Sequence, residues 1–208
     1  MNDKVLRNLS YGMYIIGAKD DKEVGCIANT AVQITSNPKT IAISINHDNY
    51  TNKVIKKTGV FSISILDENI NPEIIGTFGY KSSKDTDKYE NVDTYLLEGL
   101  SVLKQSCGNI VCKIINQTET NTHTIFLGEV IAMDNYNEEI KPMTYRYYHE
   151  VLKGKSPEKA PTYEEAKEET KNIWKCGTCG YEIEADELPE DFTCPICGEP
   201  VTVFKKIS

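Results

Sequence analysis

Four cysteines near the end of the chain have the spacing needed to bind a metal. They form two Cys-x-x-Cys pairs with 14 residues between the pairs: Cys176, Cys179, Cys194 and Cys197. Four thiolates spaced in this way can meet at one tetrahedral metal ion. Gly180 and Gly198 follow the pairs and can adopt the positive φ that lets backbone N–H groups point at the sulfurs. The spacing leaves the metal open, since zinc would make a structural ribbon and iron a one-electron carrier.

The charge balance limits the partners of this cysteine segment. The chain has 208 residues and a formal net charge of −8, and residues 174–208 contain seven acidic but only three basic side chains. Nucleic-acid binding depends on Lys and Arg contacts to phosphate, so we expect no nucleic-acid partner. An acidic surface is better suited to transient docking on a basic patch of an electron-transfer protein.

The overall composition is that of an ordinary globular protein, with 39% hydrophobic and 26% charged residues. No apolar run reaches the ~18 residues of a membrane span, and the first residues lack the apolar stretch of a secretory signal. Seven cysteines, four of them in metal spacing, indicate a reducing, cytoplasmic environment and no disulfide scaffold. We expect the other three, Cys26, Cys107 and Cys112, to be small buried hydrophobic residues.

Residues 1–152 are predicted to form a strand-rich domain. Period-two alternation or frequent β-branched residues predict strands at 11–18, 41–46, 61–65, 110–117 and 124–133. Short helices are predicted at 51–58, before Gly59, and from the Asn71-Pro72 cap to residue 79. Many short strands with few helices predict a mainly β fold, either a barrel or a sandwich.

A change of composition near residue 152 marks a boundary. Residues 153–161 are polar and contain two prolines, which indicates extended chain. The charged stretch 163–171 is predicted as a short solvated helix. We therefore divide the chain into a first domain (1–152), a tail and linker (153–173) and a C-terminal domain (174–208).

The C-terminal domain carries two stretches, residues 174–181 (WKCGTCGY) and 188–198 (LPEDFTCPICG), that resemble rubredoxin, the small iron–tetracysteinate redox protein. The segment between the pairs is shorter than in free-standing rubredoxins and is closer to the shortened domains fused to other redox proteins. The resemblance implies iron, with zinc as its substitute, and a metal-ribbon domain with an aromatic core: Trp174, Tyr181, Phe192 and Phe204. So short a segment cannot bury enough apolar surface alone, so we expect metal binding to supply its folding energy.

The first domain contains no nucleophile–base pair, Walker loop, HExxH or glycine-rich dinucleotide motif, so its residues alone assign it no function. Residues 25–38 (GCIANTAVQITSNP) and 41–46 (IAISIN), however, resemble the flavin-cradling region of the flavin reductase-like, FMN-binding split-barrel family, which includes flavoredoxin. Further matches follow in order, at 49–51, 59–65, 78–89, 123–130 and 142–149, so the similarity spans nearly all of residues 1–162. The resemblance implies a split β-barrel with short helices that binds FMN.

The residues that would hold the flavin are small or polar, and several precede a predicted helix. Small residues let the backbone approach a flat ring, and free N–H groups at a helix start form a phosphate seat. With the resemblance, the cofactor site comprises Ala28, Asn29, Thr30, Ala31, Ser44, Asn46, Asn49, Tyr50, Thr51, Lys53 and Lys88. Considered without the family, the same types are turn and capping residues that need no ligand.

Two further features bear on catalysis. His123 corresponds by resemblance to the histidine near the flavin and the nicotinamide in this family, where it would orient the ring or stabilise its reduced charge. The family often has Gly-Asp before this histidine, whereas this chain has Asn121-Thr122; the alternative is a structural histidine at a strand end. Residues 87–89 are predicted either as a lid over the flavin or as a solvated loop.

The whole arrangement resembles the high-molecular-weight rubredoxins of anaerobic bacteria. This resemblance implies an NAD(P)H-dependent flavin oxidoreductase that passes electrons from NAD(P)H through FMN to iron. The acceptor would be a flavodiiron oxygen or nitric oxide reductase, or rubrerythrin, and the barrel would form a homodimer. Three alternatives stay open: a carrier reduced by a separate reductase, a flavin reductase with a zinc-stapled docking tail, and a non-catalytic binding protein with a zinc ribbon.

Overall fold

The computed structural model describes residues 3–134, 136, 139–152, 154 and 172–207. The chain divides into two compact units, Met1–Tyr163 and Glu164–Ser208. The predicted linker, residues 153–173, lies almost entirely outside the described residues, as does the helix predicted at 163–171. The limits of both therefore stay predictions.

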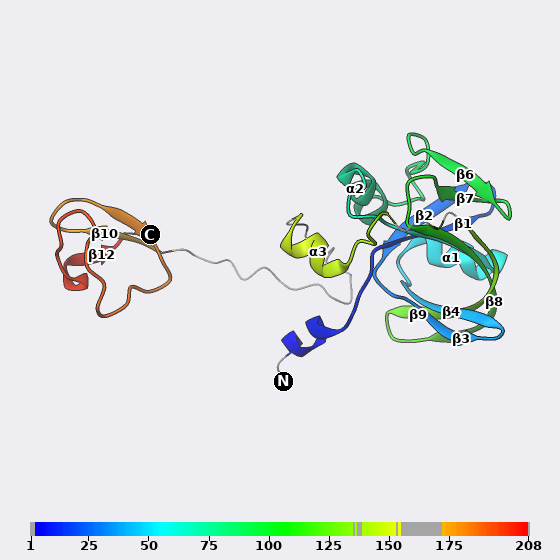
Figure 1. Ribbon diagram of the computed structural model, residues 1–208, viewed down its shortest axis with the longest axis horizontal. Helices are drawn as coiled ribbons and strands as arrows, with labels where there is room; N and C mark the ends of the chain where they lie inside the picture. Colours follow the sequence, from blue (N-terminus) through cyan, green and yellow to red (C-terminus); the bar gives the residue numbers. More distant parts are fainter. Residues whose placement is uncertain (1–2, 135, 137–138, 153, 155–171, 208) are drawn as a thin grey trace. The chain divides into compact units, whose positions relative to one another are not determined.

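A seven-stranded antiparallel sheet forms the framework of the first unit (Figure 1), with the strand order β2-β1-β5-β8-β9-β4-β3. Its strands are β1 (Tyr14–Lys19), β2 (Glu23–Ala28), β3 (Ala31–Ser36), β4 (Lys39–Asn46), β5 (Val60–Ile65), β8 (Gly108–Glu119) and β9 (His123–Asp134). All five predicted strands are present, with ends shifted by no more than three residues. The sequence pattern does not predict β2 and β3. A 3-10 helix, Asp3–Asn8, precedes the sheet.

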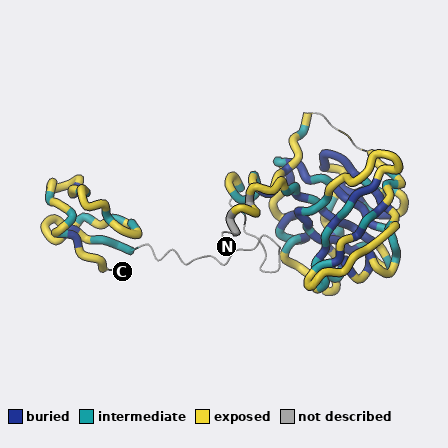
Figure 2. The backbone as a smooth tube through the Cα atoms, turned by 90° about the horizontal axis from the view of Figure 1, so that it is seen from below, coloured by how far each residue is buried: buried dark blue, intermediate teal, exposed yellow. Residues whose placement is uncertain are grey.

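The sheet curls into a barrel because strands from both of its ends bury side chains in one core. Val24 and Cys26 of β2 belong to the same apolar cluster as Ile43 and Ile45 of β4 and Phe61 of β5. Figure 2 shows buried backbone inside this unit and exposed backbone around it. The predicted mainly β fold is therefore confirmed.

Helix α1 (Tyr50–Thr58) packs Val54 and Ile55 into the barrel core. It begins at Asn49, whose Oδ1 accepts a hydrogen bond from the Thr51 N–H at 3.1 Å. It ends at Gly59, where φ is 73° and only glycine adopts the backbone conformation without strain. Because β4 ends at Asn46, the start of α1 lies close to the end of that strand.

Helices α2 (Pro72–Tyr80) and α3 (Tyr145–Glu150) supply side chains to a second apolar cluster. Phe78 of α2 and Tyr145 of α3 lie in this cluster with Ile15 of β1. Ile16, the next residue, lies in the barrel core, so β1 is buried on both faces. The predicted cap of α2 is confirmed, since Asn71 Oδ1 accepts from the Glu73 N–H at 3.0 Å; α3 is not predicted from the sequence pattern.

The period-two pattern of β5 places serines on a second buried face, which an alternating pattern would ordinarily expose. Ser62 and Ser64 are covered by the hairpin of β6 (Thr94–Leu97) and β7 (Leu100–Leu103). The Leu103 N–H donates to Ser64 Oγ at 3.1 Å, and Ser62 Oγ donates to the Ser101 carbonyl at 3.5 Å. The hairpin therefore satisfies polar groups that would otherwise be costly to bury.

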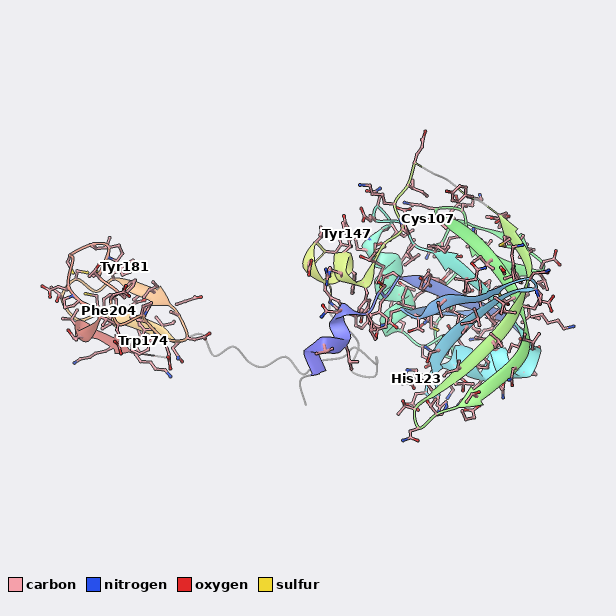
Figure 3. The ribbon with its side chains drawn as sticks, turned by 60° about the horizontal axis from the view of Figure 1, so that its bottom comes forward. Cys107, His123, Tyr147, Trp174, Tyr181 and Phe204 are labelled. Atoms are coloured by element: carbon pink, nitrogen blue, oxygen red, sulfur yellow. The ribbon has the colours of Figure 1, made fainter. Side chains whose placement is uncertain are left out.

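The second unit is built on a three-stranded sheet in the order β11-β10-β12. Its elements are β10 (Ile173–Cys176), β11 (Glu182–Glu184), a 3-10 turn (Val201–Val203) and β12 (Phe204–Lys206). The predicted aromatic core is confirmed: Trp174, Tyr181 and Phe192 pack against the cluster that contains Phe204. Figure 3 labels Trp174, Tyr181 and Phe204 in this unit. The Trp174 indole N–H donates to the Ala185 carbonyl at 2.9 Å.

A substitution at Gly128 of β9 would show how tightly the barrel core is packed. A Cβ at this position would come within 2.7 Å of Cys112 Cβ and 2.8 Å of the Phe61 ring. We expect Gly128→Ala to lower the free energy of unfolding by about 1–3 kcal/mol, because overpacking forces side chains and backbone to shift. Urea unfolding followed by far-ultraviolet circular dichroism measures this change.

Gly76 in α2 provides the matched control, since a Cβ there meets nothing within 4 Å. Gly76→Ala should raise the free energy of unfolding by up to about 1 kcal/mol, because alanine favours a helix over glycine. If Gly128→Ala proved as well tolerated as Gly76→Ala, the packing argument would be wrong.

Candidate functional site

A cavity of about 400 Å³ opens in the first unit, within the roughly 300–1,000 Å³ typical of small-molecule sites. Its lining comes from residues 26–29 at the end of β2, 44–46 at the end of β4, 49–50 at the start of α1 and 79–82 at the end of α2. His123 of β9 and the α3 residues Tyr145 and Tyr148 also line it, together with Met13, Asp48 and Ile75. The cavity therefore combines strand ends, a helix start and an aromatic side.

Seven of the predicted site residues line this cavity: Ala28, Asn29, Ser44, Asn46, Asn49, Tyr50 and His123. Strand pairing brings two of them together, since Asn46 lies opposite His123 in the register of β4 and β9. Among the other five, Thr30 lies next to the lining and donates from Oγ1 to Asn29 Oδ1 at 3.0 Å. Thr51 is buried in the first turn of α1, and Lys53 is exposed on the same helix.

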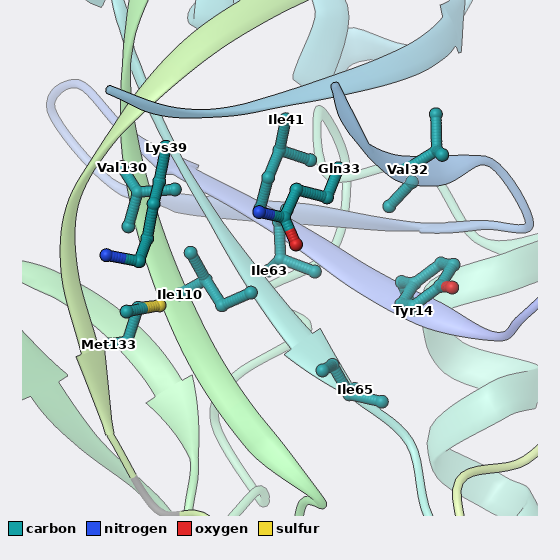
Figure 4. Close-up of a pocket in the computed structure, with 11 residues that line it drawn as sticks. Tyr14, Val32, Gln33, Lys39, Ile41, Ile63, Ile65, Ile110, Val130 and Met133 are labelled. Carbon is teal, nitrogen blue, oxygen red and sulfur yellow. The ribbon is translucent and has the colours of Figure 1, made fainter. Parts of the chain in front are cut away.

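The remaining two lie elsewhere, Ala31 in a separate groove and Lys88 in the interior. The groove, about 280 Å³ in volume, is lined mainly by strand side chains such as Ile41, Ile63 and Ile110, with Lys39 at its side (Figure 4). This largely apolar lining lacks the convergent polar groups of the 400 Å³ cavity. We therefore assign the candidate functional site to that cavity and not to the groove. The part that each of these residues plays in flavin binding remains a prediction.

His123 is held at the tip of the β8–β9 hairpin. The Thr120 Oγ1 and N–H both donate to the His123 carbonyl, at 2.7 and 2.8 Å. Its Nδ1 lies 2.8 Å from Thr122 Oγ1. Burial, together with the charge of His47, lowers the pKa of His123 below its usual value, so the imidazole is neutral at neutral pH.

The hairpin tip is also fastened to α1. Glu119, the last residue of β8, pairs with Lys56 of α1 and with His47, each at 2.9 Å. Hydrogen bonding to Lys56 lowers the pKa of the Glu119 carboxyl, so that it stays ionised at neutral pH. These contacts keep the strand that carries His123 beside the helix start that lines the cavity.

Cys26 lines the cavity but is not a nucleophile. Burial raises the pKa of its thiol to about 11, against the opposing effects of the Lys88 charge and of hydrogen bonds with Thr51 and Asn49. A thiol of this kind stays protonated at neutral pH. Cys107 and Cys112 are buried too, and the prediction that all three are small buried residues is confirmed.

Lys88 connects β2 and α2, the two elements whose ends line the cavity, through hydrogen bonds made in the interior. It is buried, and its Nζ donates to the Gly25 carbonyl at 2.8 Å and to the Phe78 carbonyl at 3.0 Å. The Phe78 carbonyl lies in the last turn of α2, where carbonyls lack partners within the helix. Tyr89 OH donates to the Val24 carbonyl at 3.4 Å. The segment 87–89, predicted as a lid or a solvated loop, is thus fastened to β2.

The four cysteines of the second unit form a compact cluster. All four sulfurs lie within 4.8 Å of one another, with Sγ–Sγ distances of 3.7 Å for Cys176–Cys197 and 3.6 Å for Cys179–Cys194. A tetrahedron with metal–sulfur bonds of about 2.3 Å has edges of about 3.8 Å. The donor set and its geometry therefore fit a tetrahedral metal ion.

The two cysteine turns have the same backbone geometry. The Gly180 N–H donates to the Cys176 carbonyl at 2.9 Å, and the Gly198 N–H to the Cys194 carbonyl at 2.8 Å. Both glycines have the predicted positive φ, 78° and 73°. Backbone hydrogen bonding lowers the pKa of Cys176, and the pKa of Cys194 is lowered too, whereas those of Cys179 and Cys197 are raised beside the neighbouring sulfurs.

Both units match known protein families. Residues 6–153 match the flavin reductase like domain. The chain belongs to the flavin reductase-like family. Residues 174–205 match the rubrerythrin, rubredoxin-like domain, which confirms the resemblance of the cysteine segment. The chain is therefore a flavin reductase-like oxidoreductase with a rubredoxin-like metal domain, and the family supports a flavin in the first unit.

Individual relatives agree with this assignment. The high molecular weight rubredoxin of Moorella thermoacetica is 38% identical over 230 aligned positions that cover all of both chains. The ferric-chelate reductase (NAD(P)H) of Archaeoglobus fulgidus is 32% identical over 170 positions, which cover 80% of this chain and all of that protein. The predicted resemblance to high-molecular-weight rubredoxins is confirmed.

Solved structures support the fold of the first unit. The NADH:FAD oxidoreductase of Streptomyces globisporus has a TM-score of 0.62 at 23% identity, covering 69% of this chain and 89% of that one. Flavoredoxin from Methanosarcina acetivorans has a TM-score of 0.56 at 21% identity, covering 62% and 70%. At this identity the likeness concerns the fold alone, and it agrees with the predicted split barrel.

Sequence reasoning missed the aromatic side of the cavity. Tyr80, Tyr145 and Tyr148 line it from α2 and α3, but the residue pattern gives none of them a role. The segment 142–149 belongs to the family resemblance, and this was the only signal that pointed to α3. Which helix covers a cavity is decided by tertiary packing, which residue spacing does not show.

The burial of Lys88 predicts a pH dependence of stability. Burial lowers the pKa of Lys88 to about 8 from an ordinary value of 10.5, so between these pH values the folded protein binds fewer protons than the unfolded chain. The free energy of unfolding should therefore rise with pH through this window, and Lys88→Met should remove that contribution. Urea unfolding of both proteins at several pH values measures the difference.

Lys113→Met, at an exposed position of β8, is the control for the loss of one lysine. It should keep the pH dependence of the unsubstituted protein. If Lys88→Met kept it as well, the Lys88 ammonium would not be held in a desolvated site.

Metal loss should unfold the second unit alone. Its buried core contains Cys176, Cys194 and Phe204, too little apolar surface to fold without a metal. The single tryptophan of the chain, Trp174, reports on this unit, so Cys194→Ala should abolish metal binding and shift its emission to the red. Circular dichroism should show the barrel still folded, and Cys107→Ala should retain one metal per chain. Unchanged Trp174 emission in metal-free protein would contradict this account.

Proposed function

We propose that the protein passes electrons from NAD(P)H to a partner protein, with FMN in the barrel cavity and iron at the four cysteines. The observation that carries this proposal is the presence of a flavin reductase-like cavity and a four-thiol centre in one chain. NAD(P)H gives two electrons together as a hydride, an iron–tetracysteinate centre takes one at a time, and a flavin supplies the chemistry that connects them. The name of the Archaeoglobus relative gives NAD(P)H as its donor, which supports the same donor here.

The residues of the cavity fit FMN in distinct roles. Asn49 and Tyr50 line the cavity at the start of α1, where the positive end of the helix dipole favours a phosphate. Lys53 adds positive charge to the same helix. Ala28 and Asn29, at the end of β2, provide a small side chain against which a flat ring can lie and an amide for its polar edge.

His123 would act as a neutral group at this site. Its Nδ1 is engaged with Thr122, so Nε2 is the ring atom through which it would contact the flavin or the nicotinamide. A neutral imidazole can donate one hydrogen bond without placing a competing cation in the cavity. This supports a role in orienting the reactants.

The second unit has one exposed and one buried cysteine in each pair. Cys179 and Cys197 are exposed, whereas Cys176 and Cys194 are buried, so a partner can approach the metal most closely at the exposed pair. Exposed acidic side chains occur in the same unit: Asp186, Glu187, Glu190 and Asp191. We propose a partner with a basic docking surface, a flavodiiron protein or rubrerythrin by family analogy.

We also propose that the barrel forms a homodimer, as the split-barrel resemblance implies. Near the apolar groove of Figure 4, Val32 and Met133 are 53% and 54% exposed. Exposed apolar side chains beside an apolar groove are typical of a surface that binds another protein.

No helix in the described part of the chain has the length and apolar character to cross a membrane.

An anaerobic absorbance spectrum of protein purified with iron supplied tests the electron route. We expect flavin and ferric–thiolate bands before NADH, and bleaching of both after it, because one chain holds both groups. Metal analysis of the same sample gives the ratio of iron to zinc.

The alternative functions give different spectra. Bands that bleach only with dithionite would indicate a carrier reduced by a separate reductase. Zinc without a ferric band, in a protein whose flavin is reduced and then lost on gel filtration, would indicate a flavin reductase with a structural tail. Protein without any colour would contradict the proposal.

A further inference from the structure

The end of α2 gives the cavity an aromatic and cationic rim that the flavin contacts proposed above do not use. Tyr80, Lys81 and Ser82 line the cavity in succession, and Tyr148 of α3 lines it beside them. The Tyr80 and Tyr148 hydroxyls lie 3.5 Å apart, and Figure 1 shows α2 and α3 side by side. We call Tyr80, Lys81, Ser82 and Tyr148 the α2–α3 rim.

The aromatic part of this rim is fixed in place. A Cβ on Gly154 would come within 2.0 Å of the Tyr148 ring, so the backbone there packs directly on that ring. His149 meets the Tyr148 ring edge-on, with 5.3 Å between centroids, and its Nδ1 lies 2.7 Å from the Gly154 carbonyl. Tyr80 is 55% exposed. The rim therefore offers two tyrosine rings, one packed against the backbone and one largely at the surface.

The charged part of the rim is positive. Lys81 lies in the cavity lining, and the Lys84 N–H donates to Ser82 Oγ at 3.2 Å, which brings a second lysine into the same turn. Lys22 Nζ donates to the Lys84 carbonyl at 3.0 Å and adds a third ammonium group. Within the part of the chain that the structure describes, no ion pair joins a carboxylate to Lys22, Lys81 or Lys84. Asp48 also lines the cavity and Asp85 lies in the same turn as Lys84, so an anion contact depends on the position of Lys81 and not on an excess of positive charge.

We propose that the α2–α3 rim binds the adenosine-phosphate half of the nicotinamide dinucleotide, and that Lys81 makes the site prefer NADPH to NADH. This inference rests on the proposed oxidation of NAD(P)H. Adenine stacks on tyrosine rings, and an ammonium group beside a phosphate gives a charge-assisted hydrogen bond. NADPH differs from NADH only by the 2′-phosphate, so a lysine that contacts this group discriminates between them.

The two halves of the rim predict different kinetic effects, measured as flavin reduction in the full-length holoprotein under anaerobic conditions. Lys81→Ala should raise KM for NADPH about tenfold and leave KM for NADH nearly unchanged, since only NADPH carries the extra phosphate. Tyr80→Ala should raise both KM values to a similar extent, about tenfold, since adenine is common to both donors. Neither substitution should change kcat by more than about twofold, because the lost contacts bind the ground state and the transition state equally well.

Lys113→Ala, on an exposed part of β8 outside the cavity, controls for the general loss of positive charge. It should leave both KM values unchanged. Equal effects of Lys81→Ala on NADPH and NADH, or no effect on either, would overturn the assignment of Lys81.

A binding measurement separates this proposal from the proposed function. Adenosine 2′,5′-bisphosphate and 5′-AMP carry no nicotinamide, so calorimetric titration of the holoprotein with them does not depend on hydride transfer. We expect the bisphosphate to bind more tightly than 5′-AMP, and Lys81→Ala to remove about tenfold of that difference. This result would support the rim even if neither dinucleotide reduced the flavin. The opposite result is that the bisphosphate does not bind at millimolar concentration, although NADH still reduces the flavin. That result would overturn the assignment of the rim as an adenosine-phosphate site and would leave the proposed function intact.

Discussion

The closure of one sheet round one apolar core is the constraint on which the cavity depends. Ile16 of β1, Cys26 of β2 and Ile45 of β4 must reach the same core, so strands that are far apart in the sheet order converge. This convergence places the end of β2, the end of β4 and the start of β9 at one cavity. Helix α1 follows β4 after a short turn, so the positive end of its dipole lies at the same place. A flatter sheet would separate these groups and leave no site.

The second unit brings its functional groups together by a different interaction, the packing of its cysteines in the core. Its three short strands enclose a cluster in which Cys176 and Cys194 are themselves buried members. The sulfur atoms that would hold the metal thus belong to the core, and metal affinity becomes folding energy. The barrel, by contrast, owes its stability to apolar burial, with β1 contributing side chains to both apolar clusters and β5 to the barrel core. The two units can therefore lose stability independently, one through metal loss and one through packing defects.

Local chemistry was predictable from the sequence, and long-range packing was not. The four cysteines and their glycine turns were located correctly, because metal ligation and positive φ depend on residues a few positions apart. Five of the seven strands of the large sheet, and helix α1, followed from periodicity and capping. Tyr148 was missed because its place depends on how α3 packs, and the buried face of Ser62 and Ser64 was missed because a distant hairpin covers it. Lys88 illustrates the same limit, since spacing does not show that its ammonium group binds the Gly25 and Phe78 carbonyls.

Three titratable groups of the cavity, which Asp48 also lines, share one electrostatic pattern. Burial raises the pKa of Cys26 and of Tyr148 and lowers that of His123, so all three are neutral at neutral pH. Lys88 lies behind the wall as a buried cation whose described acceptors are carbonyls, and Lys81 lies at the rim. Positive charge close to these neutral groups lowers the energy of an anion in the cavity more than it would in water, because the effective dielectric constant is lower. The same pattern would suit the reduced flavin and the dinucleotide donor proposed above, because both are anionic.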